Sequence, residues 1–224
     1  MLSFDDTQIA FAGKSDKELR WAYRLFKVIG KPWMVSFGGW AQNLAFALRL
    51  PVKGVIKKTI FRQFCGGENI SDSGQKIAAL GEFNIGTILD YSVEGMESND
   101  ELDRTMKEII ETIHKARDTK EIPFAVFKPT GICQTDLLMK ANKGEDQLNE
   151  ADTKEWERVL QRLDAICKAA FDADVPVFID AEDSWFQDAI DRMADSMMAK
   201  YNAQKAIVFN TIQMYRHDRL EFLK

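Results

Sequence analysis

Several short apolar runs in this 224-residue chain end in polar or charged side chains, and chemistry could take place at these ends. Asp90, Lys128, Asp180 and Asn210 each follow such a run directly, and Gln213 comes shortly after the last one. A lysine and an aspartate held close together would bind a small charged ligand, and each would lower the cost of burying the other. A polar residue after a strand can also mark only the point where the chain leaves the core. Four polar residues, each directly after an apolar run, favour a common site over this simpler explanation.

These side chains meet only if the apolar runs are parallel strands, because the carboxyl ends of such strands lie together. After about Lys58, short β-branched runs alternate with longer amphipathic stretches, which is typical of a parallel sheet covered by helices. The predicted strands are residues 59–64, 86–89, 124–127, 175–179 and 206–209, of which the first is also compatible with a helix. The predicted helices of this region are residues 73–80, 99–116, 153–171 and 185–201.

A parallel α/β pattern leads either to an open doubly wound sheet or to a closed barrel. The open dinucleotide-binding form needs a G-x-G-x-x-G turn directly after a strand, and Gly66-Gly67 lacks the third glycine. We therefore favour a (β/α) barrel, present as about five β/α units in residues 59–224. Residues 1–58 are predicted to be a separate N-terminal helical segment, with one helix at 16–29 and another between Pro32 and Pro51.

The second of these helices has an unusual composition. Residues 33–48 carry no charge, include two tryptophans, and lie between Lys31 and Arg49. The segment is shorter than the roughly 20 residues that a membrane-spanning helix needs. Two interpretations stay open: a helix buried against another part of the protein, and an interfacial helix in peripheral contact with a membrane.

The charge, the cysteine and histidine counts and the first residues limit the partners and the cellular compartment that the protein can have. The formal net charge is −5 and the pI is about 5.2, which argues against nucleic acid as the main partner. Three widely spaced cysteines and two histidines fit neither a disulfide framework nor a metal site. The N-terminus is acidic, unlike a secretory or transit peptide. A cytoplasmic protein is expected, with contact at the inner face of the cytoplasmic membrane as the extension that residues 33–48 leave open.

Four stretches of the sequence resemble one known family. Residues 175–190 read V-P-V-F-I-D-A-E-D-S-W-F-Q-D-A-I, and residues 207–215 read I-V-F-N-T-I-Q-M-Y. Residues 127–131 read F-K-P-T-G, and residues 88–94 read I-L-D-Y-S-V-E. In this order they resemble the fourth, fifth, third and second strands of the proline dehydrogenases. The I-D-A-E and N-T-x-Q-x-Y pair is specific at this separation, and the resemblance covers residue 59 to the end.

The resemblance implies a distorted (β/α)8 barrel, of the TIM-like kind, that holds FAD at the carboxyl ends of its strands. The implied reaction is oxidation of L-proline to 1-pyrroline-5-carboxylate, with electrons passed on to a quinone or another acceptor. Lys128 would pair with the proline carboxylate, and Asp180 would lie between substrate and flavin as a catalytic group. Gln213 would hydrogen-bond the polar edge of the isoalloxazine ring, and the backbone of Ala181 would touch the flavin.

The chain departs from the family pattern at its end. It stops at Lys224, inside what the resemblance implies is the fifth helix. The family's later arginine-bearing strand, and its helix with two adjacent arginines for the substrate carboxylate, are not in this sequence. We therefore expect the 224-residue chain by itself to bind FAD poorly and to show no proline oxidation.

Two other functions use the same features. Lys128 could form a Schiff base in a lyase or aldolase built on a TIM barrel. The chain could also be a non-catalytic half-barrel subunit that pairs with a complementary chain.

Overall fold

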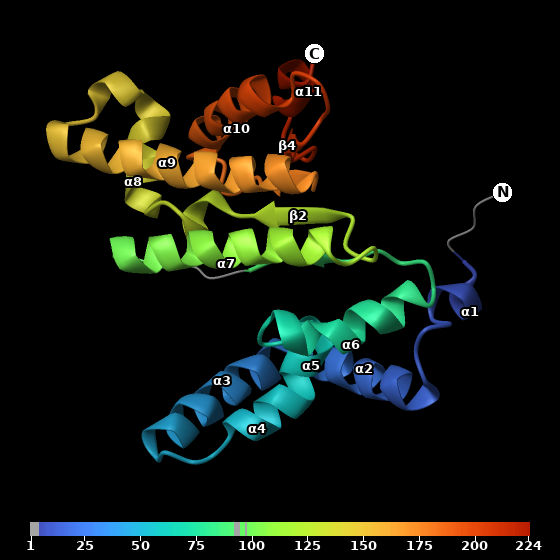
Figure 1. Ribbon diagram of the computed structural model, residues 1–224. Helices are drawn as coiled ribbons and strands as arrows, with labels where there is room; N and C mark the ends of the chain where they lie inside the picture. Colours follow the sequence, from blue (N-terminus) through green and yellow to red (C-terminus); the bar gives the residue numbers. More distant parts are fainter. Residues whose placement is uncertain (1–4, 92–94, 97) are drawn as a thin grey trace. The chain divides into compact units, whose positions relative to one another are not determined.

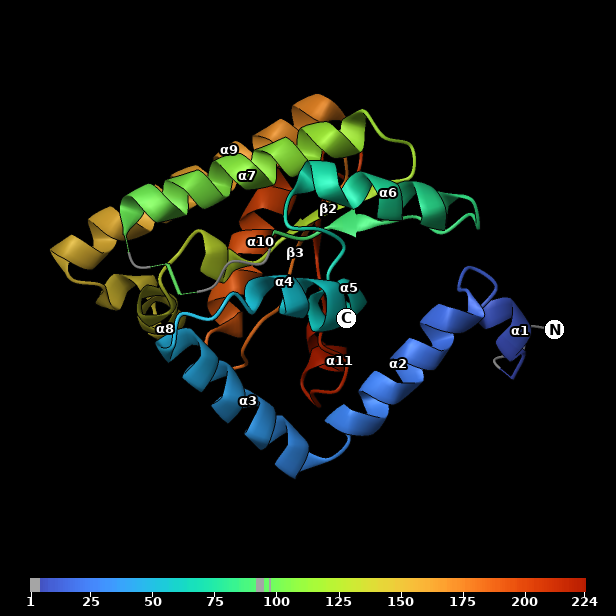
Figure 2. The ribbon, with the colours of Figure 1, turned by 90° about the horizontal axis from the view of Figure 1, so that it is seen from below.

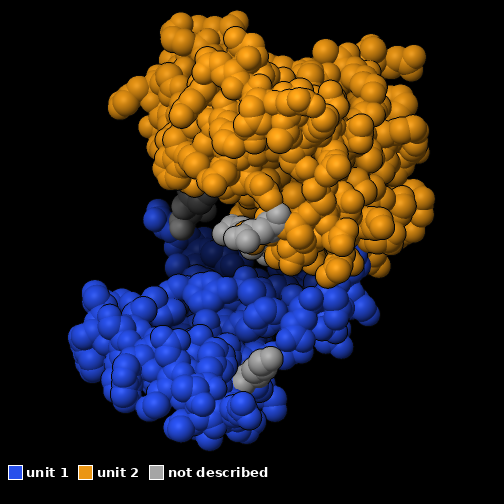
Figure 3. All heavy atoms as spheres, turned by 90° about the vertical axis from the view of Figure 1, so that its left-hand side faces the viewer, with its two compact units in different colours: residues 1–84 blue, residues 85–224 orange. Residues whose placement is uncertain are grey.

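The computed structural model describes residues 5–91, 95–96 and 98–224, without the Lys53 side chain. The chain forms two compact units, Met1–Asn84 and Ile85–Lys224, which Figure 3 shows in different colours. We describe each unit by itself. The division comes later in the chain than the predicted boundary after residue 58.

Unit 1 is built from helices, as predicted for the start of the chain. Ser15 and Glu18 form a capping box at the start of α2, in which each side chain bonds the backbone N–H of the other. Pro32 occupies the first turn of α3, where its missing N–H has no helical partner to lose. The helices are α1 (Thr7–Ala10), α2 (Asp16–Ile29), α3 (Pro32–Ala47), α4 (Lys53–Ile56), a π-helical turn (Lys57–Phe61), α5 (Arg62–Phe64) and α6 (Ile70–Gly81).

The strand predicted at residues 59–64 is wrong, because this segment is helical. It continues α4 through the π-helical turn Lys57–Phe61 into α5. The Thr59 hydroxyl donates to the Val55 carbonyl at 2.6 Å, a bond to the fourth preceding residue that requires helical backbone. The β-branched and aromatic composition of this run therefore does not decide its local structure.

Unit 2 alternates strands and helices as the sequence predicted. Its four described strands form one parallel sheet in the order β1-β2-β3-β4. The strands are β1 (Ile88–Leu89), β2 (Phe124–Phe127), β3 (Val177–Ile179) and β4 (Val208–Asn210). The helices are α7 (Asn99–Arg117), α8 (Thr135–Lys143), α9 (Glu150–Ala173), α10 (Gln187–Tyr201) and α11 (Arg219–Phe222), with 3₁₀ turns at Pro129–Gly131 and Glu145–Gln147. The fold class is therefore α/β with a parallel sheet.

Three helices of unit 2, α7, α9 and α10, pack together beside the sheet. α7 packs on α9 and on β2, while α10 packs on α9 and β4; Figure 2 shows α7 and α9 running side by side. Figure 1 shows the same elements from the side. The strand order has no reversal, and right-handed crossovers between successive neighbouring strands put every connecting helix on the same face.

The two sheet faces differ in chemistry. On the face toward the helices, Ala125, Phe127 and Ile179 are each at most 1% exposed. The opposite face carries three half-buried aromatic rings in mutual contact, with centroids 4.8 to 6.1 Å apart: Phe124, Phe178 and Phe209. The core thus lies between the sheet and the helices, and the three aromatic rings make the opposite face of the sheet apolar as well.

Among the described residues, no helix combines the length and apolarity needed to cross a bilayer.

Candidate active site at the carboxyl ends of the strands

Lys128 and Asp180 occupy equivalent positions on neighbouring strands. Lys128 follows the end of β2 and Asp180 follows the end of β3. Phe127 pairs with Ile179 in the parallel register, so the next residue of each strand lies at the same level. Side chains alternate between the two faces of a strand. Since Phe127 and Ile179 face the helices, Lys128 and Asp180 emerge on the aromatic face.

Asp180 is held by the end of β4. Ile179 pairs with Asn210, the last residue of β4, so the next residue, Thr211, lies at the level of Asp180. The Thr211 hydroxyl donates to Asp180 Oδ1 at 3.1 Å and accepts the backbone N–H of Ala181 at 2.6 Å. The backbone N–H of Asp180 also bonds the Phe127 carbonyl at 3.0 Å. Thr211 therefore holds the Asp180 carboxylate from the β4 side, and Phe127 holds the Asp180 backbone from the β2 side.

Glu182 joins the loop after β2 to the loop after β3. Its two carboxylate oxygens accept the Thr130 backbone N–H at 2.9 Å and the Thr130 hydroxyl at 2.6 Å. Burial raises the pKa of Glu182 above its ordinary value, while the Thr130 bonds and the charge of Lys128 act in the opposite direction. The charge of Asp180 raises this pKa further. Lys128, Asp180 and Glu182 therefore form one electrostatic cluster.

Gln213 lies next to this cluster. Its amide Nε2 donates to the Glu182 carbonyl at 2.7 Å. Its Oε1 is buried and has no hydrogen-bond partner among the described residues. An unsatisfied buried acceptor is costly, so this oxygen suits the N–H donor of a bound molecule.

A buried polar network supports the loop that carries Glu182. The Glu182 backbone N–H donates to Gln187 Oε1, and Gln187 in turn donates to Asp191 Oδ1. Asp191 also accepts from Asn210 at 3.0 Å and from Arg219 at 2.6 Å, and the side chains of Asp191 and Arg219 are each 6% exposed. The network ties α10 and α11 to the carboxyl end of β4.

Asp90 follows β1 at the same edge of the sheet. Leu89 pairs with Ala125, so Asp90 lies beside Val126, two residues before the level of Lys128. That Asp90 belongs to the cluster stays a prediction. Residues 92–94 of the run that resembled the second strand lie outside the described residues.

The structure links four of the site residues taken from the sequence to Glu182 or to Thr211. The charges of Lys128 and Asp180 act on Glu182, and Gln213 donates to the Glu182 carbonyl. The backbone N–H of Ala181 bonds the Thr211 hydroxyl, which in turn donates to Asp180. Thr130, Glu182 and Thr211 had no assigned role. The signal that could have found them is their place in the F-K-P-T-G, I-D-A-E and N-T-x-Q-x-Y runs, which carry polar side chains beyond those selected.

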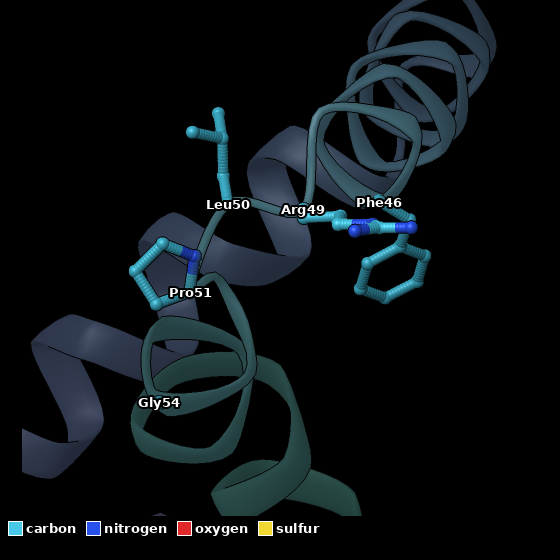
Figure 4. Close-up of a pocket in the computed structure, with 5 residues that line it drawn as sticks. All are labelled: Phe46, Arg49, Leu50, Pro51 and Gly54. Carbon is cyan, nitrogen blue, oxygen red and sulfur yellow. The ribbon is translucent and has the colours of Figure 1, made fainter.

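A separate hollow lies in unit 1, between α3 and α4, with a volume of about 420 Å³ (Figure 4). It is lined by Phe46, Arg49, Leu50, Pro51 and Gly54, none of which was a predicted site residue. The lining holds one cation and no carboxylate, so it lacks an acid and base pair. The strand ends of unit 2 remain the better candidate for chemistry.

The fold and the strand-end cluster are those of an α/β protein with a site at one edge of a parallel sheet. The model of the proline dehydrogenase family matches residues 73–224. The chain belongs to this family.

The chain is also similar to individual proteins. "Proline dehydrogenase 1, mitochondrial" of Dictyostelium discoideum is 29% identical, over 98% of this chain and 45% of that protein. "Carbapenem antibiotics biosynthesis protein CarD" of Pectobacterium carotovorum is 29% identical, over 71% of this chain and 42% of that protein. The chain thus spans about half the length of the curated relatives it matches.

A solved structure has a similar fold. It is the crystal structure of proline utilization A (PutA) from Bdellovibrio bacteriovorus inactivated by N-propargylglycine, with a TM-score of 0.60 and 16% identity. The likeness covers 76% of this chain and 19% of that one. At this identity it supports the fold alone.

Proposed function

We propose that this chain contributes the active site of an enzyme that oxidises L-proline to 1-pyrroline-5-carboxylate, with FAD as cofactor. The observation that carries the proposal is the Lys128, Asp180 and Glu182 cluster at the strand ends of a proline dehydrogenase family member. Family membership favours this chemistry over a Schiff-base lyase.

The finer fold belongs to the same proposal. Unit 2, Ile85–Lys224, would contribute to a (β/α)8 barrel, preceded in the chain by the helical unit 1 instead of the predicted segment 1–58. An unreversed strand order with all connecting helices on one face is what consecutive units of such a barrel have. In that arrangement the aromatic face of the sheet becomes the barrel interior, and Lys128 and Asp180 lie at its mouth.

Lys128 would bind the carboxylate of proline. A compact ammonium at the strand end neutralises the substrate carboxylate, and the aromatic face nearby keeps water away from the apolar ring. Asp180 would set the geometry between substrate and cofactor, since Thr211 and two backbone bonds already fix the segment. A fixed side chain spends little of the binding energy on ordering itself.

The residues near Gln213 fit a flavin. Its buried Oε1 lacks a donor, and the isoalloxazine ring offers an N–H at its polar edge. The Ala181 N–H already bonds Thr211, so a contact between Ala181 and the ring would come from its carbonyl. When bound, FAD would supply the two-electron acceptor for the hydride that leaves proline. The protein residues would bind, orient and exclude water.

A quinone-type molecule would receive the electrons after proline is oxidised. Such acceptors are lipid-soluble, so the proposal includes a cytoplasmic protein that reaches the inner face of the cytoplasmic membrane.

The test uses the protein as its gene encodes it, purified and scanned for flavin absorbance. L-Proline should bleach the flavin anaerobically and yield a pyrroline that an aromatic amino-aldehyde traps as a coloured adduct. L-Proline deuterated at C5 should react more slowly. Borohydride trapping of a substrate on Lys128, with no flavin in the protein, would instead support the lyase.

A further inference from the structure

The longest apolar helix of unit 1 has almost no covering. None of the α3 side chains is buried, and Trp33, Phe37 and Trp40 are 67%, 62% and 60% exposed. Only Met34, Ala41 and Ala45 are partly covered. These three positions form one narrow stripe of the helix, and α3 packs on α2. The rest of its circumference presents apolar atoms to water, so the helix needs an apolar partner.

The segment around α3 has the opposite charge to the rest of the chain. Residues 14–62 contain eleven lysines and arginines and two carboxylates, a net charge of +9. The remaining residues contain 19 basic and 33 acidic side chains, a net charge of −14. Such asymmetry within one acidic protein points to an anionic partner for the basic segment.

The basic residues adjoin the apolar helix itself. Lys31 is its N-cap residue, and Arg49 follows its C-terminal end; both are exposed. Within the described part of the chain, neither forms an ion pair, whereas Arg20, Lys57 and Arg62 do. Long cationic side chains at both ends of an apolar helix can reach polar headgroups while the helix lies lower.

We propose that α3 and its basic flanks form a docking surface for an anionic lipid bilayer. A bilayer surface offers acyl chains for the tryptophans and phosphate groups for the cations, whereas nucleic acid would leave the apolar side chains exposed to water. The 16-residue helix is about 24 Å long, shorter than the roughly 30 Å hydrocarbon core. It therefore lies in the interface instead of crossing. The proposal does not depend on proline oxidation.

The first test is flotation of the protein, as its gene encodes it, with lipid vesicles. The protein should bind phosphatidylcholine vesicles that contain about 30% phosphatidylglycerol and should bind pure phosphatidylcholine vesicles weakly. Raising NaCl from about 0.05 to about 0.5 M should release much of it. Absence of binding to the anionic vesicles, or equal binding to both kinds, would overturn the proposal.

Variants then locate the surface. The double variant Trp33→Ser with Trp40→Ser should lower vesicle partitioning about tenfold. Trp185→Ser is the matched control, because Trp185 is 59% exposed and lies in unit 2. Brominated lipids should quench the fluorescence of the wild-type protein, and this quenching should shrink in the double variant alone. Equal partitioning of the double variant and the control contradicts the assignment.

A charge variant keeps the test valid if the tryptophan variant misfolds. Lys31→Gln with Arg49→Gln should lower partitioning about tenfold and weaken its salt dependence. Lys107→Gln with Lys120→Gln removes the same charge from exposed positions of unit 2 and should change neither the vesicle partitioning nor its salt dependence.

Two outcomes would assign α3 to another partner. Loss of self-association in the tryptophan variant, with vesicle binding unchanged, would assign α3 to a second copy of the chain and overturn the proposal. Tight binding of a mixed-sequence DNA duplex without vesicle binding would also overturn it.

Discussion

Unit 1 and unit 2 differ in how far their apolar side chains are buried. In unit 2 the large apolar residues of α7, α9 and α10 lie between helices and sheet, and most are almost completely buried. In unit 1 the described residues include few buried side chains, while α3 exposes tryptophans and phenylalanines. Burial of apolar surface is the main favourable term in folding, so unit 2 should hold most of the stability. Unit 1 should gain stability chiefly when a partner covers its exposed apolar side chains.

The largest contrast is expected for phenylalanines of the two units. Phe127→Ala removes a side chain that is 1% exposed and should lower the free energy of unfolding by about 3–5 kcal/mol. Phe37→Ala removes one that is 62% exposed and should change it by less than about 0.5 kcal/mol. Urea unfolding measures both. Similar losses in the two variants would mean that unit 1 has a core comparable to that of unit 2.

Ion pairs should show the same contrast. Arg219→Met leaves Asp191 as a buried carboxylate without its cation, at a cost of about 3–5 kcal/mol. Arg20→Met breaks a pair with Asp16 whose side chains are 69% and 85% exposed, and should cost about 0.5 kcal/mol or less. Hydrogen exchange should show faster opening around β4 and α10 in the first variant only. Unchanged exchange there would contradict the supporting role of the Asp191 network.

A smaller effect should appear in the pH dependence of stability. Burial raises the pKa of Glu182 above its ordinary 4.5, so the folded protein binds a proton more tightly than the unfolded chain. This contribution is fully present below the unfolded pKa and is lost as the pH rises through the folded pKa. Glu182→Gln should therefore raise the melting temperature at neutral pH, and the gain should vanish below about pH 4. A variant that is less stable than wild type at neutral pH would show that ionised Glu182 stabilises the fold.

The smallest effects should come from two matched helix caps. Ser15 caps α2 in unit 1 and Ser98 caps α7 in unit 2, each in a capping box with a glutamate three residues later. Replacing either serine with alanine removes about 1 kcal/mol of local helix stability. Ser98→Ala should lower the midpoint of global unfolding, because α7 packs on the core, whereas Ser15→Ala should only increase fraying of α2 in hydrogen exchange. A lower midpoint of global unfolding for Ser15→Ala would show that α2 unfolds cooperatively with the core of unit 2.

The sequence predicted the elements of unit 2 because its local signals agree with its packing. The strand at 124–127 was confirmed with the same limits, and those at 86–89, 175–179 and 206–209 were confirmed with shorter or shifted ones. The helix at 99–116 was confirmed as α7, which ends one residue later. α8 was not predicted, because its nine residues are too few to show a clear period.

The sequence could not predict the hydrogen bonds that assemble the site. Glu182 and Thr130 are 52 residues apart, and Thr211 and Asp180 are 31 apart, so each pair depends on strand register. The order of parallel strands could be inferred from the alternating pattern, but the level of each strand end could not. Asp90 illustrates the difference, since it follows its strand directly and still lies two residues before the level of Lys128.

The most direct test of the account compares Lys128→Met and Asp180→Asn with wild type, in the protein as its gene encodes it. Bound flavin is first quantified, and L-proline is then mixed in anaerobically while the flavin absorbance is followed. The account predicts that both variants retain flavin and that their bleaching slows by about a hundredfold or more, because Lys128 is proposed to bind the substrate and Asp180 to set its geometry. Lys154→Met, on the surface of α9, should bleach at the wild-type rate. Wild-type bleaching in the Lys128 and Asp180 variants would contradict a site at these strand ends.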